Sequence, residues 1–203
     1  MKLMITAFEA FGGDAENAAA LTMEDFPDSV FGFDVHKVLL PTVFGTAAEK
    51  AVEEAKRIRP DAIVCLGQAG RRSAVTPERT AVNVMNASRP DNEGNRPVDE
   101  PVVPGGPAAY FSTLPVRRMT LAIQKAGIPA EVSESAGTFV CNSVMYAMLH
   151  YVSEAGLEIP CGFIHLPYLD VQACAEGTPV IARSEAVRAV RTAAGVLAED
   201  MKA

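Results

Sequence analysis

Cys141 is the residue in this sequence that is best placed to react. It follows a turn of small residues in "AGTFVCN", residues 136–142, at the start of a predicted helix for which Thr138 is a plausible N-cap. The free N–H groups and the positive dipole end of a helix start favour a thiolate and lower its pKa. The same N–H groups can stabilise an oxyanion on an attacked carbonyl. The alternative is a cysteine that only packs the helix against a sheet, which is the common state of free cysteines.

The other three cysteines lack such an environment. Cys65 lies among aliphatic residues in "AIVCLG", Cys161 begins a predicted strand, and Cys174 lies in "VQACAEG" without an activating neighbour. No C-x-x-C pair is present, which argues against a disulfide framework or a zinc ribbon. A zinc site would have to combine Cys141, His150, Cys161 and His165, but one helix cannot aim the first two at one metal. We therefore expect no metal.

A cysteine nucleophile needs a base, and the sequence contains three histidines. His150 lies nine residues beyond Cys141 on the same predicted helix, about 13 Å along it and half-way round its axis. His36 lies in an early strand beside charged residues and is expected at a surface or an edge. His165 ends the apolar run "GFIHLP", and α/β sheets place their sites at the carboxyl ends of strands. Elimination therefore favours His165.

A third group would orient the imidazole and stabilise its charged form. The pattern of residues leaves four acids open for this role: Asp61, Glu78, Asp91 and Asp170. Glu78 differs from the others only mildly, because "TPERTAVNV" reads as a turn that leads into an alternating strand.

Strand-like and helix-like segments alternate along the chain, which predicts an α/β fold: a three-layer α/β/α sandwich around a mostly parallel, mixed twisted sheet. The pattern predicts strands over 2–8, 34–44, 61–67 and 162–167, and helices over 46–60 and 116–127 and from 178 onward. The helix at 46–60 should open with a capping box from Thr46 to Glu49. We expect residues 1–203 to form a single catalytic domain.

Two stretches contain glycine in unusual numbers or settings. "LGQAGRR" matches neither a Walker loop nor a dinucleotide fingerprint, so we expect no cofactor, and Arg71 and Arg72 read as a solvated surface pair.

Residues 86–115 are rich in proline and glycine. So long a loop in a compact domain is usually functional, disordered or part of an assembly. Contact with the active site and contact with another subunit are both open for this loop.

The composition narrows the classes of partner. The chain has 203 residues, 49% hydrophobic and 21% charged, with a formal net charge of -7 and no basic stripe, so a nucleic-acid partner is not expected. Its apolar runs are too short for a signal peptide or a membrane span, so no membrane partner is expected either. A cytoplasmic location with reduced thiols follows as the expectation.

Several blocks together resemble the pyroglutamyl peptidase I family of cysteine peptidases. These blocks are "AFEAFGGDAEN", "LGQAGRR", "ERTAVN", "SRPDNEGNRP", "GPAAYFSTLP", "AGTFVCN" and "GFIHLPYL", in this order over nearly the whole chain. The resemblance implies a cytosolic cysteine peptidase that removes an N-terminal pyroglutamyl residue from peptides. It also implies a homotetramer.

The resemblance further implies roles for residues in the matching blocks. Cys141 becomes the nucleophile, His165 the general base and then acid, and Glu78 the group that orients His165. The implied substrate-binding residues are Phe8, Phe11, Asn17, Gln68, Arg89 and Val140.

The chain departs from the family pattern in its first loop, where Ala10 and Ala18 stand at positions at which proline is common. These changes leave two other functions to weigh. One is a cysteine amidase that acts on another small amide, and the other is a non-catalytic binding protein.

Overall fold

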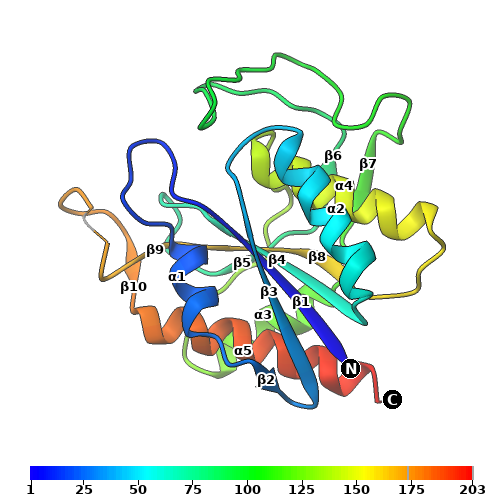
Figure 1. Ribbon diagram of the computed structural model, residues 1–203. Helices are drawn as coiled ribbons and strands as arrows, with labels where there is room; N and C mark the ends of the chain where they lie inside the picture. The colour runs from blue at the N-terminus through cyan, green and yellow to red at the C-terminus, as the bar shows by residue number, and fades with distance from the viewer. Residues whose placement is uncertain (173, 203) are drawn as a thin grey trace.

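Six strands form one central sheet in a computed structural model that describes residues 1–172 and 174–202 (Figure 1). Across the sheet they are β2 (Ser29–Val30), β3 (Phe33–Leu40), β1 (Lys2–Phe8), β4 (Ala62–Gln68), β8 (Cys161–Leu166) and β5 (Thr76–Pro77). The four inner strands run parallel, and the two short edge strands are antiparallel to their neighbours. Strand β4 is buried along its whole length, as expected for a strand covered on both faces.

Helices cover both faces of this sheet and form the outer layers of the sandwich (Figure 1). One apolar cluster packs α1 (Ala18–Asp25), α3 (Val116–Lys125) and α5 (Arg183–Asp200) on one face. A second cluster packs α2 (Thr46–Ile58) and α4 (Val140–Glu154) on the other. The predicted three-layer arrangement is therefore confirmed, and α4 carries Cys141 on the face it shares with α2.

Three local predictions were wrong in detail. The capping box at 46–60 is absent, because Gly45 with φ 73° is the N-cap of α2 and Thr46 lies inside the helix. The strand predicted over 34–44 ends at Leu40, before Pro41. The C-terminal helix begins only at Arg183, because Val180–Ile181 forms strand β10 and pairs with β9 (Tyr168–Leu169). Gly45 and Pro41 set the first two boundaries locally, whereas pairing with the distant strand β9 sets the third.

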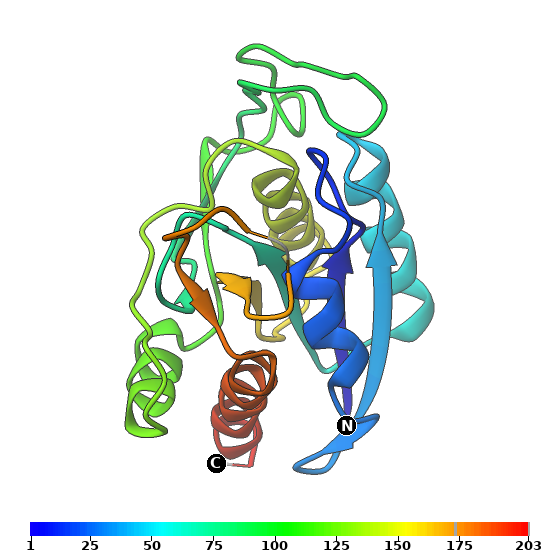
Figure 2. The ribbon, with the colours of Figure 1, turned by 90° about the vertical axis from the view of Figure 1, so that its left-hand side faces the viewer.

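The proline- and glycine-rich segment, residues 86–115, follows β6 (Thr80–Val82) and includes β7 (Ala109–Phe111), which pairs with β6 as a small antiparallel sheet. It extends beyond the end of the central sheet at the top of Figure 1 and Figure 2. At the beginning of the segment, the Asn86 N–H donates a hydrogen bond of 3.0 Å to the carbonyl of Thr138, just before α4. The segment therefore reaches the region just ahead of α4.

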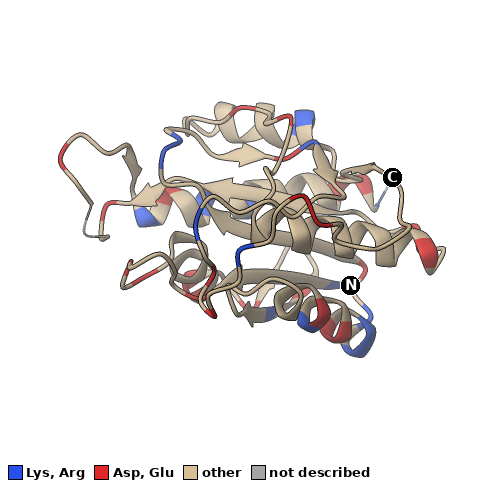
Figure 3. Cartoon of the chain, turned by 90° about the horizontal axis from the view of Figure 1, so that it is seen from above, with Lys and Arg blue, Asp and Glu red and all other residues tan. Residues whose placement is uncertain are grey.

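Charged residues are dispersed over the outer helices and loops, with both signs interspersed (Figure 3). This distribution agrees with the absence of a basic stripe from the sequence. Within residues 1–172 and 174–202, no helix has the combined length and apolar character needed to cross a bilayer.

Candidate active site

Cys141 lies against the backbone of β4 near its carboxyl end. An added Cβ on Gly67 would lie 3.1 Å from Cys141 Sγ and 2.7 Å from the Phe163 ring, so the sulfur approaches the strand where glycine leaves room. In the sheet register, Gly67 is the direct partner of His165 on β8. The Phe163 and His165 rings lie on this same side with centroids 4.7 Å apart. The fold therefore brings Cys141 and His165 to the same point of the sheet.

Glu78 is the acid that contacts His165. Glu78 Oε1 lies 2.7 Å from His165 Nδ1, and the Glu78 side chain is fully buried. A carboxylate only accepts hydrogen bonds, so Nδ1 carries the proton and donates it. The neutral imidazole then has its lone pair on Nε2, which is the nitrogen a general base would use.

The other three acids that the sequence left open have structural partners elsewhere. Asp61 accepts a hydrogen bond from the Lys2 N–H, Asp91 from the Phe44 and Asn95 N–H groups, and Asp170 from the Arg183 N–H. Burial alone would raise the pKa of Glu78, but the hydrogen bond and charge of His165, with smaller contributions from Ser133 and Arg72, hold it below its usual value. Glu78 is therefore the acid that stays ionised beside the imidazole.

The start of α4 differs from the sequence prediction. Phe139, not Thr138, is the N-cap, and no side chain caps the helix. The Thr138 hydroxyl donates instead to the Asn86 carbonyl at 2.8 Å. Among the described residues no backbone carbonyl accepts from the N–H groups of Val140 and Cys141, and the Cys141 N–H interacts with its own thiol. N–H groups at a helix start can bind an oxyanion.

Asn142 anchors this helix start to the neighbouring strand. It is fully buried, its Oδ1 accepts from the Val82 N–H at 2.9 Å, and its Nδ2 donates to the Val82 and Val84 carbonyls. The residue next to Cys141 is therefore fixed by three hydrogen bonds, which also fixes the direction of the Cys141 side chain.

The pKa of Cys141 moves in the direction opposite to the sequence prediction. Burial, followed by the negative charge of Glu78, raises the pKa of the thiol to about 12, and the helix N–H and Arg72 oppose this only in part. Burial also raises the pKa of Cys65 to about 11 and that of Cys161 well above its usual value. This environment disfavours the thiolate, so attack by Cys141 calls for a base that accepts the thiol proton.

Alkylation should reveal the protonation state of Cys141. A thiol whose charged form is disfavoured gains thiolate only as the pH rises, so the rate of Cys141 alkylation by iodoacetamide should increase through pH 9 without an earlier plateau. Mass spectrometry assigns the modified cysteine, and Cys141→Ala provides the blank. A plateau with its midpoint below pH 7 would contradict this, because it would show a preformed thiolate–imidazolium pair.

Gly67 should tolerate no side chain. Gly67→Ala places a methyl group 2.7 Å from the Phe163 ring, which is itself fully buried, so the core must shift. We expect a loss of about 1–3 kcal/mol in the free energy of unfolding, measured in urea. Gly195→Ala is the matched control, because it lies within α5 with its nearest neighbour 3.3 Å away at the edge of the partly exposed Phe31 ring. Alanine should stabilise that helix by up to about 1 kcal/mol. Equal effects of both substitutions would contradict the close approach at Gly67.

A cavity of about 640 Å³ opens beside Cys141 and His165. Phe11 and Phe139 line it with ring centroids 6.1 Å apart, and the Arg89 guanidinium lies 4.6 Å from the Phe11 centroid. Residues from three distant parts of the chain thus surround the sulfur: the first loop, the segment after β6, and the start of α4. Gln68 lines the cavity as well.

Three of the predicted substrate-binding residues, Phe8, Asn17 and Val140, are not among the residues that line this cavity. Phe8 faces the core beneath the site, with its ring 6.2 Å from Phe163. Val140 is fully buried in the same cluster. Asn17 is the N-cap of α1, where its Oδ1 accepts from the Ala19 N–H at 2.9 Å and its Nδ2 donates to the Glu9 carbonyl. All three support the walls of the site from behind.

Gln68 is held by a network of hydrogen bonds at the cavity wall. Its Oε1 accepts from the Ala18 N–H at 2.8 Å and from Gln172, and its Nε2 donates to Asp14 at 2.9 Å. Tyr168 donates to the same Asp14 oxygen. Proline at position 18 could not make the first bond, so the departure from the family pattern here adds a hydrogen bond to the site.

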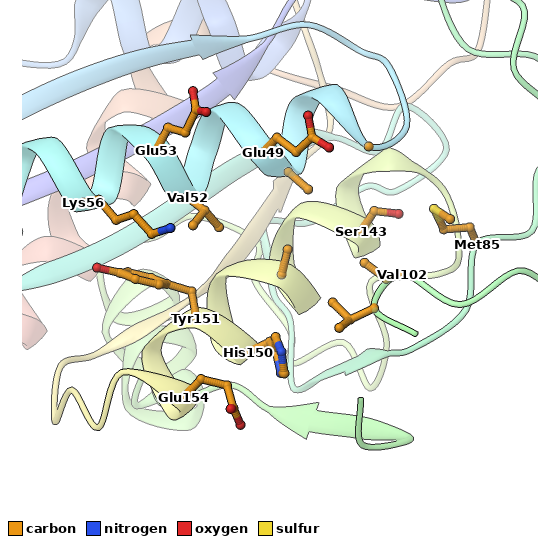
Figure 4. A pocket seen from close by; sticks show the side chains of 14 residues that line it. Glu49, Val52, Glu53, Lys56, Met85, Val102, Ser143, His150, Tyr151 and Glu154 are labelled. Atoms are coloured by element: carbon orange, nitrogen blue, oxygen red, sulfur yellow. The ribbon is translucent and has the colours of Figure 1, made fainter. Parts of the chain in front are cut away.

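The remaining candidates lie elsewhere. His150 lines a second cavity of about 500 Å³ between α2 and α4 (Figure 4), where its Nδ1 lies 2.9 Å from the Tyr110 hydroxyl. His36 is half-buried on β3 beside Asp34. No cluster of three or more His, Cys, Asp or Glu suited to a metal is found in the part of the chain that the structure describes, and the four residues of the zinc alternative do not come together.

Sequence reasoning missed several residues of the site. Phe139 lines the cavity directly beside the nucleophile position, and an aromatic residue next to Cys141 was a visible signal. Arg72 is not a solvated surface residue, because its guanidinium forms an ion pair with the buried Glu78. Nothing local to "GRR" could have distinguished Arg72 from the exposed Arg71.

Comparisons of sequence agree with this geometry. A family model described as pyroglutamyl peptidase matches residues 1–200. Pyrrolidone-carboxylate peptidase 1 of Caldanaerobacter subterraneus subsp. tengcongensis is 42% identical over 202 residues, which cover 99% of this chain and 100% of that protein. The pyrrolidone-carboxylate peptidase of Levilactobacillus brevis is 44% identical over 194 residues, which cover 95% of each.

Solved structures are similar over the same length. A mutant pyrrolidone carboxyl peptidase from Pyrococcus furiosus matches with a TM-score of 0.95 and 39% identity, covering 99% of this chain and 100% of that one. Pyroglutamyl peptidase I from Bacillus amyloliquefaciens matches with a TM-score of 0.92 and 38% identity, covering 98% and 97%. With sequence and fold in agreement along its whole length, this chain belongs to the pyroglutamyl peptidase family.

Proposed function

We propose that this chain removes N-terminal pyroglutamyl residues from peptides with Cys141 as nucleophile, His165 as general base and then acid, and Glu78 as the group that orients His165. The observation that carries this assignment is the 2.7 Å hydrogen bond between Glu78 and His165 beside Cys141. Membership of the family supports the substrate class. Family membership weighs against a non-catalytic binding protein.

The proposed reaction is acyl transfer in two steps. Nε2 of His165 takes the Cys141 proton as the sulfur attacks the pyroglutamyl carbonyl, and the oxyanion is stabilised by the N–H groups at the start of α4. His165 then donates that proton to the leaving amine, which leaves a thioester on Cys141. Water, activated by His165, hydrolyses the thioester and restores the thiol. Because burial and the charge of Glu78 disfavour the thiolate, the first proton transfer is part of the proposed chemical step.

The cavity suits a flat, uncharged lactam ring. Phe11 and Phe139 offer aromatic faces, and Gln68 stands at the wall with its side chain already bonded. We propose that the ring packs on these aromatics while the backbone of Gln68 meets the lactam amide. Arg89 would lie over the peptide that follows the ring. Phe8 and Asn17 would support these groups from behind, and Val140 would meet the substrate through its N–H at the start of α4.

A pair of coumarin amides tests the proposal. The clean protein should hydrolyse pyroglutamyl-coumarin amide and should leave prolyl-coumarin amide uncleaved, because proline has the same ring without the lactam carbonyl and carries a charged amine. Efficient turnover of the prolyl amide, or preference for another small amide by a large margin in kcat/KM, would favour the amidase alternative.

We further propose that residues 1–203 act as one catalytic domain in a cytoplasmic homotetramer. All four cysteines are free thiols, as a reducing compartment favours. Val98, in the segment that extends beyond the sheet, and Phe111, at the end of β7, are 68% and 72% exposed, and exposed apolar groups of this size suit a subunit contact.

Light scattering coupled to size exclusion should give a mass four times the 21.5 kDa of one chain. Phe111→Ser should lower that mass, because it removes apolar area from the contact, whereas Arg57→Gln on α2 should not. A 21.5 kDa species at micromolar concentration in the unmodified protein would refute the tetramer.

A further inference from the structure

Arg72 reaches the buried end of the Glu78 side chain from the loop that follows β4. Its Nη1 lies 2.5 Å from Glu78 Oε1, the same oxygen that accepts the His165 hydrogen bond. The same nitrogen donates to the Thr76 hydroxyl, which in turn donates to the His165 carbonyl at 3.4 Å. Thr76 is also the direct partner of His165 between β5 and β8. The arginine is therefore joined to both members of the Glu78–His165 pair.

We propose that Arg72 is a positioning residue for hydrolysis, whose guanidinium keeps Glu78 ionised with Oε1 turned toward His165 and offsets the charge of Glu78 beside Cys141. This inference rests on the roles proposed above for these three residues. The inference adds Arg72 to them. Arg72 supports the acid–base chemistry through Glu78 and does not touch the reacting atoms.

The surroundings of Glu78 explain why it needs such a partner. Glu78 is fully buried, and its second oxygen, Oε2, has no hydrogen-bond partner among the described residues. Burying a carboxylate that is bonded through only one oxygen is costly unless a cation compensates it. The groups that face it are Arg72, His165 on β8, Cys141 on α4, and Ser133, whose backbone pairs with it.

Among the described groups that face Glu78, Arg72 is the one that carries a permanent positive charge. The neighbouring Arg79 pairs with Glu134 instead. The Arg72 side chain is 30% exposed, so its place is not explained by core packing.

The electrostatic consequence has a definite sign. The Arg72 charge disfavours a proton on Glu78 and on His165, and it favours the Cys141 thiolate. These directions agree with the contributions of Arg72 to the pKa values of Glu78 and Cys141, both of which it lowers. Without the guanidinium, the Glu78–His165 pair should bind its proton at higher pH. The base would then be lost at a pH where the wild-type enzyme still works.

The pH dependence of kcat/KM tests the inference. Arg72→Gln should move the acid limb upward by roughly one pH unit, and Arg72→Lys, which keeps the charge, should return it most of the way. Arg57→Gln, which breaks the exposed Arg57–Glu54 pair on α2, is the matched control and should leave the limb in place. Arg72→Met keeps the apolar stem and serves if the glutamine variant does not fold. Loss of rate by an equal factor at every pH, or an unchanged profile, would overturn the inference.

A titration without substrate separates this inference from the proposed function. The imidazole of His165 can be followed by NMR in protein labelled at histidine, and its signal is identified by its loss in His165→Ala. Its pKa should rise in Arg72→Gln relative to the unmodified protein and return in Arg72→Lys. An unshifted titration would contradict the role of Arg72 whatever the substrate. Absence of turnover in the unmodified protein would contradict the proposed function alone.

Discussion

Cys141→Ala is expected to lower kcat for pyroglutamyl-coumarin amide by roughly 10⁴-fold or more, since no other group can form the thioester. The N–H groups at the start of α4 and the cavity remain in this variant, so substrate should still bind with a KM near that of the unmodified protein. Initial rates across a range of substrate concentrations give both constants. The residual rate should be independent of thiol reagents.

Cys174→Ala is the matched control for the loss of a thiol. Cys174 is also a free, partly exposed cysteine, but it is absent from the cavity lining. Its replacement should change kcat by less than about two-fold, as expected for a residue outside the site. Full activity in Cys141→Ala would exclude the thioester mechanism outright.

Glu78→Gln should have the second largest effect, a loss of roughly 10³–10⁴ in kcat. The glutamine amide can donate to Nδ1 of His165, which would place the imidazole proton on Nε2 and remove the lone pair that accepts the thiol proton. The change also removes the charge that stabilises the imidazolium. Because the shape of the side chain is kept, KM and the midpoint of thermal unfolding should change little compared with kcat.

Glu134→Gln is the control for the same chemical change. Glu134 pairs with Arg79 close to the site but is 76% exposed, so its replacement should leave kcat within about two-fold. A loss of less than ten-fold in Glu78→Gln would mean that His165 keeps its orientation through other contacts, and the proposed role of Glu78 would then be withdrawn.

Apolar periodicity in the sequence was sufficient to predict the layers of the fold and its buried inner strands. Alternation of apolar strands and amphipathic helices predicted the three layers, and continuous apolar runs identified β4 and β8 as buried strands. Position at the end of β8 identified His165, and position at a helix start identified Cys141. The predictions of layers and buried strands succeed because periodicity and turn residues act over a few neighbouring residues, whereas the roles of Cys141 and His165 stay predictions.

Boundaries that depend on distant partners were predicted less well. The α5 helix begins late because β10 pairs with β9, and α1 was not predicted because "AAALTMED" has a weak amphipathic pattern. The helix is fixed instead by the Asn17 cap and by burial against α5 and the sheet. Such contacts leave little trace in the segment itself.

The sequence by itself determined the α/β class, the nucleophile candidate, its histidine and the family resemblance. The residue pattern left four acids open as the partner of His165, and the family resemblance implied Glu78. The tertiary structure brings Glu78 and His165 into contact although they are 87 residues apart. It reversed the expected pKa shift of Cys141, because the burial and the nearby carboxylate that raise it come from packing rather than from helix position. The tertiary structure also shows that Arg72, which the sequence predicted as part of a solvated surface pair, forms an ion pair with the buried Glu78. A buried charge pairs with a group that is close in space, which the local sequence does not reveal.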